Sequence, residues 1–349
     1  MILISITIFC GILILIVLVK SFSFTPEIKN GISEIKRLNI GGVDQYVLIR
    51  GENINNPVLL FLHGGPGTTE LIPFRLFHKR LEKYFTVVVW EQRGTGKSFS
   101  PDIPVESMTI DQFVSDARDL TDYLRRRFEK DKILVTGHSW GSALGLLTVS
   151  RYPDFYYAFV GSGQEVCPEE SESLALQYLL EKNKDNLKAT TLLNAINRPD
   201  PYLTMDDEGA WFEKIKIQRK WLVASGGELF NRSDYSLLFN SNTLTAPEYS
   251  LMDFINFGRG SIFSLKTMWP QVMKINFMTQ IPKVNVPVYF LQGRHDFNTS
   301  SVLVEKYFNS LSAPSKQLVW FEKSGHHPMY EEPDKYDDYL INTIFPMCK

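Results

Sequence analysis

Three stretches of the chain are continuous apolar runs that end in glycine or polar residues. They are PVLLFLHGG at 57–65, FTVVVWEQRG at 85–94 and KILVTGHSWG at 132–141. A strand with both faces buried has this form, because neither face needs polar side chains. Two-sided burial is typical of a parallel sheet with helices on both faces, so these runs restrict the chain to few fold classes.

Helical segments alternate with the apolar runs. Residues 110–129 place Phe113, Ala117 and Leu120 at helical spacing, and 143–152 is also helical. The same alternation continues with apolar runs at 158–165, 286–296 and 317–327 and helical stretches near 301–311 and 333–345. Strands that alternate with helices predict an α/β fold with a mostly parallel sheet and helices on both faces. At the start, residues 34–50 predict a hairpin around Gly41-Gly42.

The alternation stops in one long internal segment. Residues 167–280 contain helix-like stretches and no buried apolar strand pattern. We interpret this segment as a helical cap inserted into a core made of residues 34–166 and 281–349. The polar residues 21–33 are predicted to be a linker.

The first twenty residues are predicted to be a transmembrane anchor. Residues 2–19 carry no charge, and as a helix they would extend roughly 27 Å, close to the hydrocarbon thickness of a bilayer. A cleaved signal peptide and a buried core helix are the alternatives, but no basic start or small-residue cleavage site is present. Residues 1–20 therefore predict a single-pass membrane protein. The side of the catalytic domain stays open, with a mild preference for the cytoplasm from Lys20, Lys29, Lys36 and Arg37.

Composition excludes several classes of function. The 349 residues are 44% hydrophobic and 22% charged, which allows a large core, and the formal net charge of −2 does not favour nucleic acid as a partner. The three cysteines have no metal-site or disulfide spacing. No complete phosphate loop, dinucleotide fingerprint or His-Glu-x-x-His motif occurs, so we expect neither a cofactor nor a metal.

A candidate nucleophile lies between a predicted strand and a predicted helix. Gly137-His138-Ser139-Trp140-Gly141 fits the pattern G-x-S-x-G. The sharp turn needs small flanking residues because the backbone of the nucleophile is strained and crowded. The helix start that follows supplies N–H groups and a positive dipole for a developing oxyanion. We therefore predict Ser139 as the nucleophile.

A glycine-rich loop follows the first apolar run. In His63-Gly64-Gly65-Pro66-Gly67, the glycines allow the backbone to turn its N–H groups inward. The N–H groups of Gly65 and Trp140 are predicted to form the oxyanion hole. His63 itself is expected to brace the loop and to take no part in the chemistry.

The base and the acid are expected downstream of the nucleophile. A serine hydroxyl needs a base to take its proton, and the base needs an orienting partner. Only His295, His326 and His327 follow Ser139. His326 follows Ser-Gly at a strand end and is predicted as the base, whereas His327 is expected to point elsewhere. Asp296 ends the run VPVYFLQGRHD and is predicted as the acid, because α/β sites lie at the carboxyl ends of strands.

These motifs together resemble the proline iminopeptidase family of α/β hydrolases. The matching pieces are HGGPG at 63–67, EQRGTGKS at 91–98, GHSWGS at 137–142, GRHD ending at Asp296 and SGHHPMYEEP at 324–333. The resemblance implies the same triad, a helical cap over the site and no cofactor. Two positions depart from the family pattern: Glu91 replaces the usual aspartate, and His138 replaces a glycine.

The sequence is compatible with three functions. An aminopeptidase that releases N-terminal residues from small peptides and a carboxylesterase acting on small esters would share one serine mechanism. A catalytically inactive binding protein is the third, and the complete set of catalytic residue types argues against it. An aminopeptidase must also hold a cationic α-amine, for which Glu165 and Glu228 are the candidate carboxylates.

Overall fold

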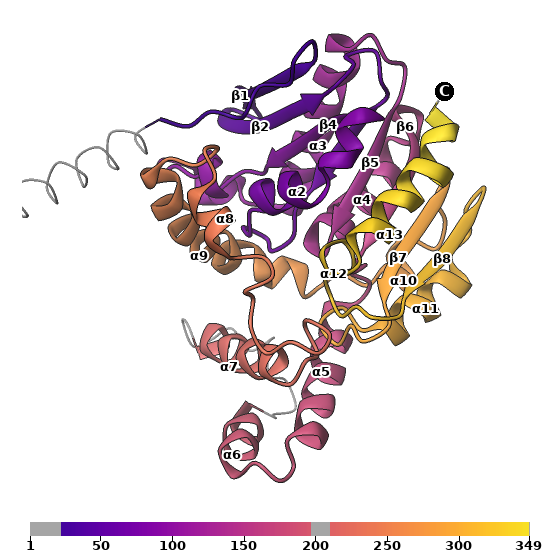
Figure 1. The fold of residues 1–349 in the computed structure, drawn as a ribbon. Helices are drawn as coiled ribbons and strands as arrows, with labels where there is room; N and C mark the ends of the chain where they lie inside the picture. Colours follow the sequence, from indigo (N-terminus) through magenta and orange to yellow (C-terminus); the bar gives the residue numbers. More distant parts are fainter. Residues whose placement is uncertain (1–21, 197–209, 349) are drawn as a thin grey trace, which may run out of the picture.

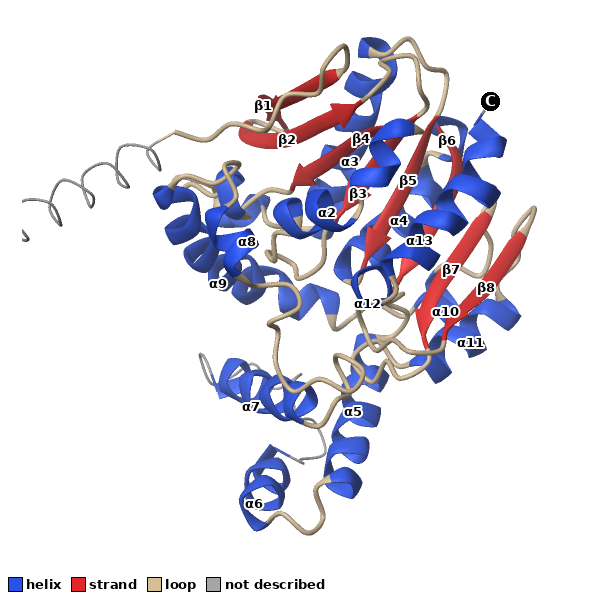
Figure 2. Ribbon diagram, in the orientation of Figure 1, coloured by secondary structure: helices blue, strands red, loops and turns tan. Residues whose placement is uncertain are grey.

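A single eight-stranded sheet forms the centre of the molecule. The computed structural model describes residues 22–196 and 210–348, with strand order β1-β2-β4-β3-β5-β6-β7-β8 (Figures 1 and 2). The first two strands pair antiparallel with each other, β2 pairs antiparallel with β4, and every other neighbouring pair is parallel. The strands are β1 (Ile32–Ile40), β2 (Val43–Gly51), β3 (Val58–Leu62), β4 (Thr86–Glu91), β5 (Ile133–His138), β6 (Tyr156–Ser162), β7 (Val288–Gly293) and β8 (Lys316–Phe321).

Alternate residues of one central strand enter separate hydrophobic cores. Leu60 of β3 packs into a cluster that contains Leu120 and Leu144, whereas Phe61 packs into a cluster that contains Tyr336. Every residue of β3 is buried, as expected for a strand covered on both faces. The covering helices are α2 (Leu71–Phe77), α3 (Ile110–Arg127), α4 (Trp140–Arg151), α11 (Ser301–Ser310), α12 (Pro328–Glu331) and α13 (Pro333–Tyr339).

The segment between β6 and β7 carries only helices in its described part. In Figure 1 these helices lie below and beside the ends of the central strands. The Ser250 hydroxyl accepts a hydrogen bond from the Asp253 backbone and the Asp253 carboxylate accepts one from the Ser250 backbone, so the longest helix starts at a capping box. The helices are α5 (Pro168–Lys182), α6 (Leu187–Ile196), α7 (Ala210–Ala224), α8 (Ser241–Thr245), α9 (Leu251–Val272) and α10 (Phe277–Gln280).

The predicted α/β fold with its mostly parallel sheet is confirmed. Two boundaries differ from the prediction. The helix expected over 143–152 begins at Trp140, directly after the serine, and the final helix expected over 333–345 ends as α13 at Tyr339 and continues as a π-helical turn.

The predicted anchor at residues 2–19 lies outside the described residues. Within residues 22–196 and 210–348, no helix has the length and apolar character needed to cross a membrane.

Candidate active site

Ser139 occupies a strained turn between β5 and α4. Its backbone has φ 54° and ψ −122°, a conformation rarely adopted by residues other than glycine. A Cβ atom added to Gly137 would lie 2.1 Å from the carbonyl oxygen of Gly141, and one added to Gly141 would lie 2.0 Å from that of Leu62. Both glycines are therefore required for the close approach that lifts Ser139 out of the sheet edge.

The glycine-rich loop lies directly beside this turn. A Cβ atom added to Gly64 would lie 3.2 Å from the Cβ of Ser139. Gly65 has φ 114°, and a side chain there would clash with the backbone nitrogens of Gly67 and Thr68. The loop thus brings Gly65, predicted for the oxyanion hole, to the wall of the cavity that also contains Ser139 and Trp140.

His63 braces the loop, as expected. Its Nε2 accepts a hydrogen bond from the Gln92 backbone (3.1 Å), and the Gln92 amide donates to the His63 carbonyl (2.9 Å). The Gln92 side-chain oxygen in turn accepts from the indole nitrogen of Trp140 (2.9 Å). Burial lowers the pKa of His63 to about 4, so this histidine is a neutral structural group near pH 7. Gln92 therefore ties the glycine loop to the serine turn, a role that no sequence motif indicated.

His326 and Asp296 meet in the arrangement of a base and its orienting acid. The Nδ1 atom of His326 lies 3.0 Å from Oδ2 of Asp296, and both side chains are buried. The other carboxylate oxygen accepts hydrogen bonds from the backbone N–H groups of Asn298 and Thr299, both at 2.9 Å. The amide of Gln292 donates to Oδ2 at 2.8 Å. Several hydrogen bonds thus fix Asp296, and Asp296 in turn holds the His326 ring at Nδ1. The other ring nitrogen, Nε2, lies on the side of the ring that faces away from Asp296.

A second acid–histidine pair contacts the candidate base and lines the same cavity. Nδ1 of His138 is 2.7 Å from Oε1 of Glu70, and Nε2 of His138 is 2.9 Å from the backbone carbonyl of His326. Burial alone would lower the pKa of His138, but the charge of Glu70 and the hydrogen bond to it raise that pKa above its ordinary value. The phenol of Tyr330 donates to the other oxygen of Glu70 at 3.3 Å. Sequence reasoning missed Glu70; its only signal was its place shortly after the glycine loop.

One cavity of about 410 Å³ is lined by four of the five residues predicted for catalysis or the oxyanion hole, namely Gly65, Ser139, Trp140 and His326. The fifth, Asp296, is buried and reaches the cavity only through its contact with His326. The wall opposite the sheet comes from helices α7 and α9 and the segment before α8. The apolar lining residues are Ile215, Leu238, Phe239, Phe257, Leu265, Trp269 and Val272. Such a size and lining suit a small ligand.

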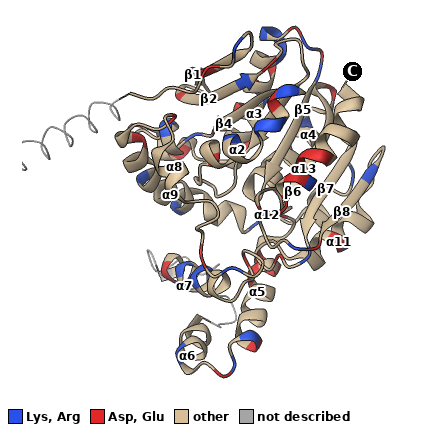
Figure 3. Cartoon of the chain, viewed as in Figure 1, with Lys and Arg blue, Asp and Glu red and all other residues tan. Residues whose placement is uncertain are grey.

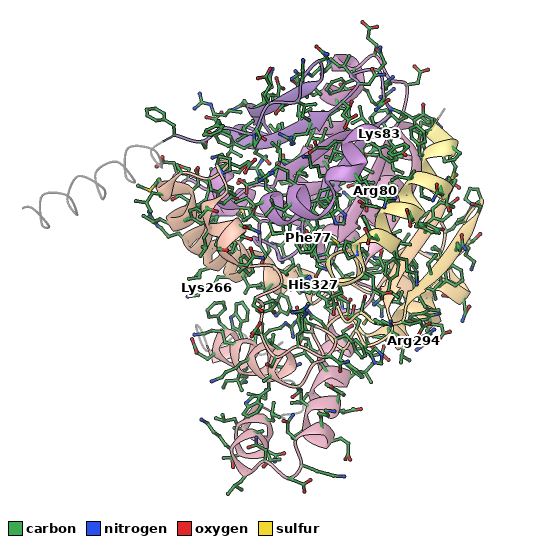
Figure 4. All side chains as sticks on the ribbon, in the orientation of Figure 1. Phe77, Arg80, Lys83, Lys266, Arg294 and His327 are labelled. Carbon is green, nitrogen blue, oxygen red and sulfur yellow. The ribbon has the colours of Figure 1, made fainter. Side chains whose placement is uncertain are left out.

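The expectation that His327 points elsewhere was wrong. His327 lines the same cavity as His326, and its Nε2 lies 3.2 Å from Oε1 of Glu228. Figure 4 labels His327 near the middle of the molecule. It differs from His326 in its partner, because His326 faces Asp296. Burial lowers the pKa of His327, so the ring is a neutral hydrogen-bonding group near pH 7.

The two candidate amine-binding carboxylates both line the cavity but differ in charge. Burial, and then the negative charge of Glu172, raise the pKa of Glu165 to about 8. Burial would also raise the pKa of Glu228, but its hydrogen bond to His327 and the charges of neighbouring groups, among them Arg219, lower it to about 2. Oε2 of Glu228 is buried and accepts no hydrogen bond of ordinary length from the described residues, and the Tyr235 phenol lies close to this carboxylate on the cavity wall. At neutral pH, Glu228 is thus the ionised carboxylate of the pair and Glu165 is largely protonated.

Glu172 and Arg219 form an ion pair next to these carboxylates, with Nη1 of Arg219 3.0 Å from Oε2 of Glu172. That pair is neutral as a whole. The Glu172–Arg219 pair therefore does not neutralise the ionised Glu228, which contributes one negative charge to the cavity wall.

Comparison with known proteins places the chain in a family. The family model described as "Alpha/beta hydrolase family" matches residues 59–338. The chain belongs to the alpha/beta hydrolase family. Within this family it resembles proline iminopeptidases, as its motifs indicated.

Two relatives illustrate the resemblance. The protein named "Probable aminopeptidase YbaC" from Bacillus subtilis is 36% identical over 317 residues, which cover 90% of this chain and 97% of the relative. The proline iminopeptidase of Lactobacillus delbrueckii subsp. bulgaricus is 32% identical, covering 88% of this chain and 97% of the relative. The chain is thus an α/β hydrolase whose relatives carry aminopeptidase names.

Solved structures support the fold of this family. VinJ superposes with a TM-score of 0.63 at 18% identity, covering 91% of this chain and 99% of VinJ. The proline iminopeptidase-related protein of Thermus thermophilus gives a TM-score of 0.55 at 18% identity, covering 91% of this chain and 99% of that protein. At these identities the likeness concerns the fold alone.

Proposed function

We propose that the chain is a serine hydrolase with Ser139 as nucleophile, His326 as base and Asp296 as orienting acid. The observation that carries the proposal is the hydrogen bond between His326 Nδ1 and Asp296 Oδ2 in a cavity that also contains the strained Ser139 turn. Because Asp296 occupies Nδ1, the other ring nitrogen is the one that takes the serine proton.

The reaction proceeds by two acyl transfers. Ser139 Oγ attacks the substrate carbonyl while His326 takes its proton, and the N–H groups of Gly65 and Trp140 stabilise the oxyanion. The protonated His326 then gives its proton to the leaving group. Water then attacks the acyl carbonyl while His326 takes its proton. The bond to Ser139 Oγ breaks, the acid product leaves, and His326 returns the proton to Oγ.

We further propose that the leaving group is the remainder of a small peptide and that the enzyme is an aminopeptidase of the proline iminopeptidase type. A free α-amine is largely cationic at neutral pH and needs a carboxylate partner in a closed pocket. Glu228 supports this assignment, because it is buried and ionised on the cavity wall and one of its oxygens accepts no hydrogen bond of ordinary length from the described residues. Glu165 is the weaker candidate, since its pKa of about 8 leaves it largely neutral.

A carboxylesterase acting on small esters is the second candidate. The apolar wall from α7 and α9 favours it, because an apolar acyl group needs no charged partner. Both functions use the same triad.

One comparison separates the two functions. Labelling of one sample with a fluorophosphonate first confirms that the enzyme has an active serine. Unlabelled enzyme is then used to compare the kcat/KM values for a proline amide and for its N-acetylated form. The aminopeptidase should lose most of its kcat/KM on acetylation, because Glu228 is left buried without its partner. Equal rates on both forms, or hydrolysis of p-nitrophenyl esters only, would contradict the aminopeptidase function and favour the esterase.

The sequence also supports a proposed location. We propose that residues 1–20 anchor the enzyme in a membrane, with the side of the catalytic domain undecided, because residues 2–19 form an uncharged run long enough to cross a bilayer. The full-length protein should sediment with membranes through a carbonate wash and be released by detergent. Uncleaved full-length protein in the soluble fraction would contradict the anchor.

A further inference from the structure

Exposed apolar side chains gather at one part of the described molecule. Thirteen large hydrophobic side chains are exposed among the described residues. Eight of them belong to the N-terminal arm (residues 22–31), the segment before α8 (residues 225–240), or helices α8 and α9. We call these eight the α8–α9 surface. Its members are Phe22, Phe24, Phe239, Leu244, Leu251, Met252, Ile255 and Ile262.

The N-terminal arm is attached to these helices. The backbone N–H of Phe24 donates to the carbonyl of Pro247 at 3.0 Å, in the connection between α8 and α9. The ammonium group of Lys97 binds both Ser23 Oγ (2.9 Å) and Asp253 Oδ2 (2.5 Å). Figure 1 shows the arm passing the outer end of α8 and α9 before it reaches β1. The arm and the start of α9 therefore form one structural unit.

The outward side of α9 combines apolar and cationic residues. Its exposed positions are Leu251, Met252, Ile255, Gly258, Arg259, Ile262 and Lys266, with no acid among them. Figure 3 shows blue patches within the largely tan α9, and Figure 4 labels Lys266 at the margin of the molecule. The single acid of the helix, Asp253, is held by Lys97 and Ser250. An exposed helix side with apolar and cationic residues is the composition that favours the surface of an anionic bilayer.

We propose that the α8–α9 surface rests on the bilayer. The apolar run ends at residue 19, and Phe24 is already fixed to the α8–α9 connection. Five residues span at most about 17 Å, so an anchor at residues 2–19 holds this surface close to the lipid headgroups. The inference rests on the proposed anchor and is independent of hydrolysis.

Contact between the α8–α9 surface and the bilayer would also orient the cavity relative to the membrane. The inward side of α9 contributes Phe257, Ser261, Leu265 and Trp269 to the cavity wall. Phe239 belongs to both surfaces, because it lines the cavity and is 41% exposed. One wall of the cavity therefore lies beside the bilayer in this arrangement.

The experiment uses the full chain in lipid nanodiscs that contain anionic lipid. Cys10 is replaced by serine, while buried Cys167 and Cys348 stay in place. The environment-sensitive dye NBD is attached to Ile255→Cys on α9 and, as the matched control, to Val302→Cys on α11, another exposed apolar position in a helix. A second pair, Met252→Cys and Val105→Cys, repeats the comparison in case one variant fails to fold.

If the α8–α9 surface rests on the bilayer, dye at positions 255 and 252 should emit at shorter wavelength than dye at the control positions. It should also lose most of its intensity when the nanodisc contains lipid with a doxyl quencher on the upper acyl chain. Dye at Val302 and Val105 should respond to iodide in the water and not to the doxyl lipid. Equal doxyl quenching at test and control positions would overturn the proposal. Dye at Ile255 that is shielded from both quenchers would also overturn it, because a second copy of the chain or its own N-terminal segment would then cover the surface.

Discussion

His138 donates a hydrogen bond from Nε2 to the backbone carbonyl of His326, at 2.9 Å. A carbonyl oxygen can only accept, so Nε2 carries a proton, and Nδ1 faces the Glu70 carboxylate at 2.7 Å. The backbone N–H of His326 donates in turn to the carbonyl of Glu228 at 2.7 Å. The candidate base is thus held at its backbone from both sides, and at its ring by Asp296.

His138→Leu, which removes the donor at Nε2, should therefore lower kcat more than it raises KM. Loss of the contact lets the His326 loop shift, and a displacement of this kind costs about 10- to 100-fold in rate. Steady-state kinetics with a soluble substrate measure the effect. His295→Leu is the matched control, because His295 stacks on Phe230 outside the cavity and its loss should leave kcat/KM unchanged. An unaffected His138→Leu enzyme would exclude a positioning role.

Ser139→Ala should lower kcat by about 10⁴- to 10⁶-fold, because only binding and the oxyanion hole would remain. Fluorophosphonate labelling of the purified protein should disappear in the same variant. Thermal unfolding of both proteins checks that the fold is retained. Retained labelling in Ser139→Ala would show that a different residue is the nucleophile.

His326→Ala and His327→Ala should separate the two neighbouring histidines. His326 contacts Asp296, whereas His327 contacts Glu228. Loss of His326 should therefore abolish turnover, while loss of His327 should mainly raise KM for a substrate with a free amine. The comparison of kcat between the two variants measures this difference, and the assignment of the base is wrong if His327→Ala is the more damaged enzyme in kcat.

Glu228→Gln should discriminate between substrates with and without a charged amine. The neutral amide keeps the shape of the side chain and removes its charge, so kcat/KM for the proline amide should fall by about 10- to 100-fold, as for loss of a charge-assisted hydrogen bond. Hydrolysis of the acetylated form should change little. Glu165→Gln is the matched control, because Glu165 is already largely protonated at pH 7. Equal losses in both variants would contradict the assignment of Glu228 to the amine.

Local sequence patterns predicted the sheet and the positions of Ser139, Asp296 and His326, because strand periodicity and strand-end motifs are short-range signals. These short-range signals could not predict the contacts that support the catalytic residues. Glu70 and His138 are 68 residues apart, and Glu228 and His327 are 99 apart, so only the folded chain brings them together. The difference in ionisation between Glu165 and Glu228 also depends on burial and on neighbours from α5 and α7, which a linear pattern does not contain.

Glu165 also makes the stability of the protein depend on pH. Its pKa is raised by burial and by Glu172 from an ordinary value of 4.5 to about 8 in the folded protein. A carboxyl group with a raised folded-state pKa binds its proton more tightly in the folded than in the unfolded chain. Its contribution to stability is therefore complete below pH 4.5 and is lost as the pH rises through about 8.

Glu165→Gln should consequently stabilise the protein at high pH and change its stability little at pH near 4.5. The amide cannot ionise, so the cost of a buried carboxylate, at most about 5 kcal/mol at pH 9, is removed. Urea unfolding of the wild type and the variant across this pH range gives the difference directly. Buried Glu91 and Glu331, whose pKa values are each raised to about 7, titrate in both proteins and cancel in the comparison. A difference in unfolding free energy that stays constant from pH 5 to pH 9 would show that Glu165 is ionised throughout, and would restore it as a candidate partner for the substrate amine.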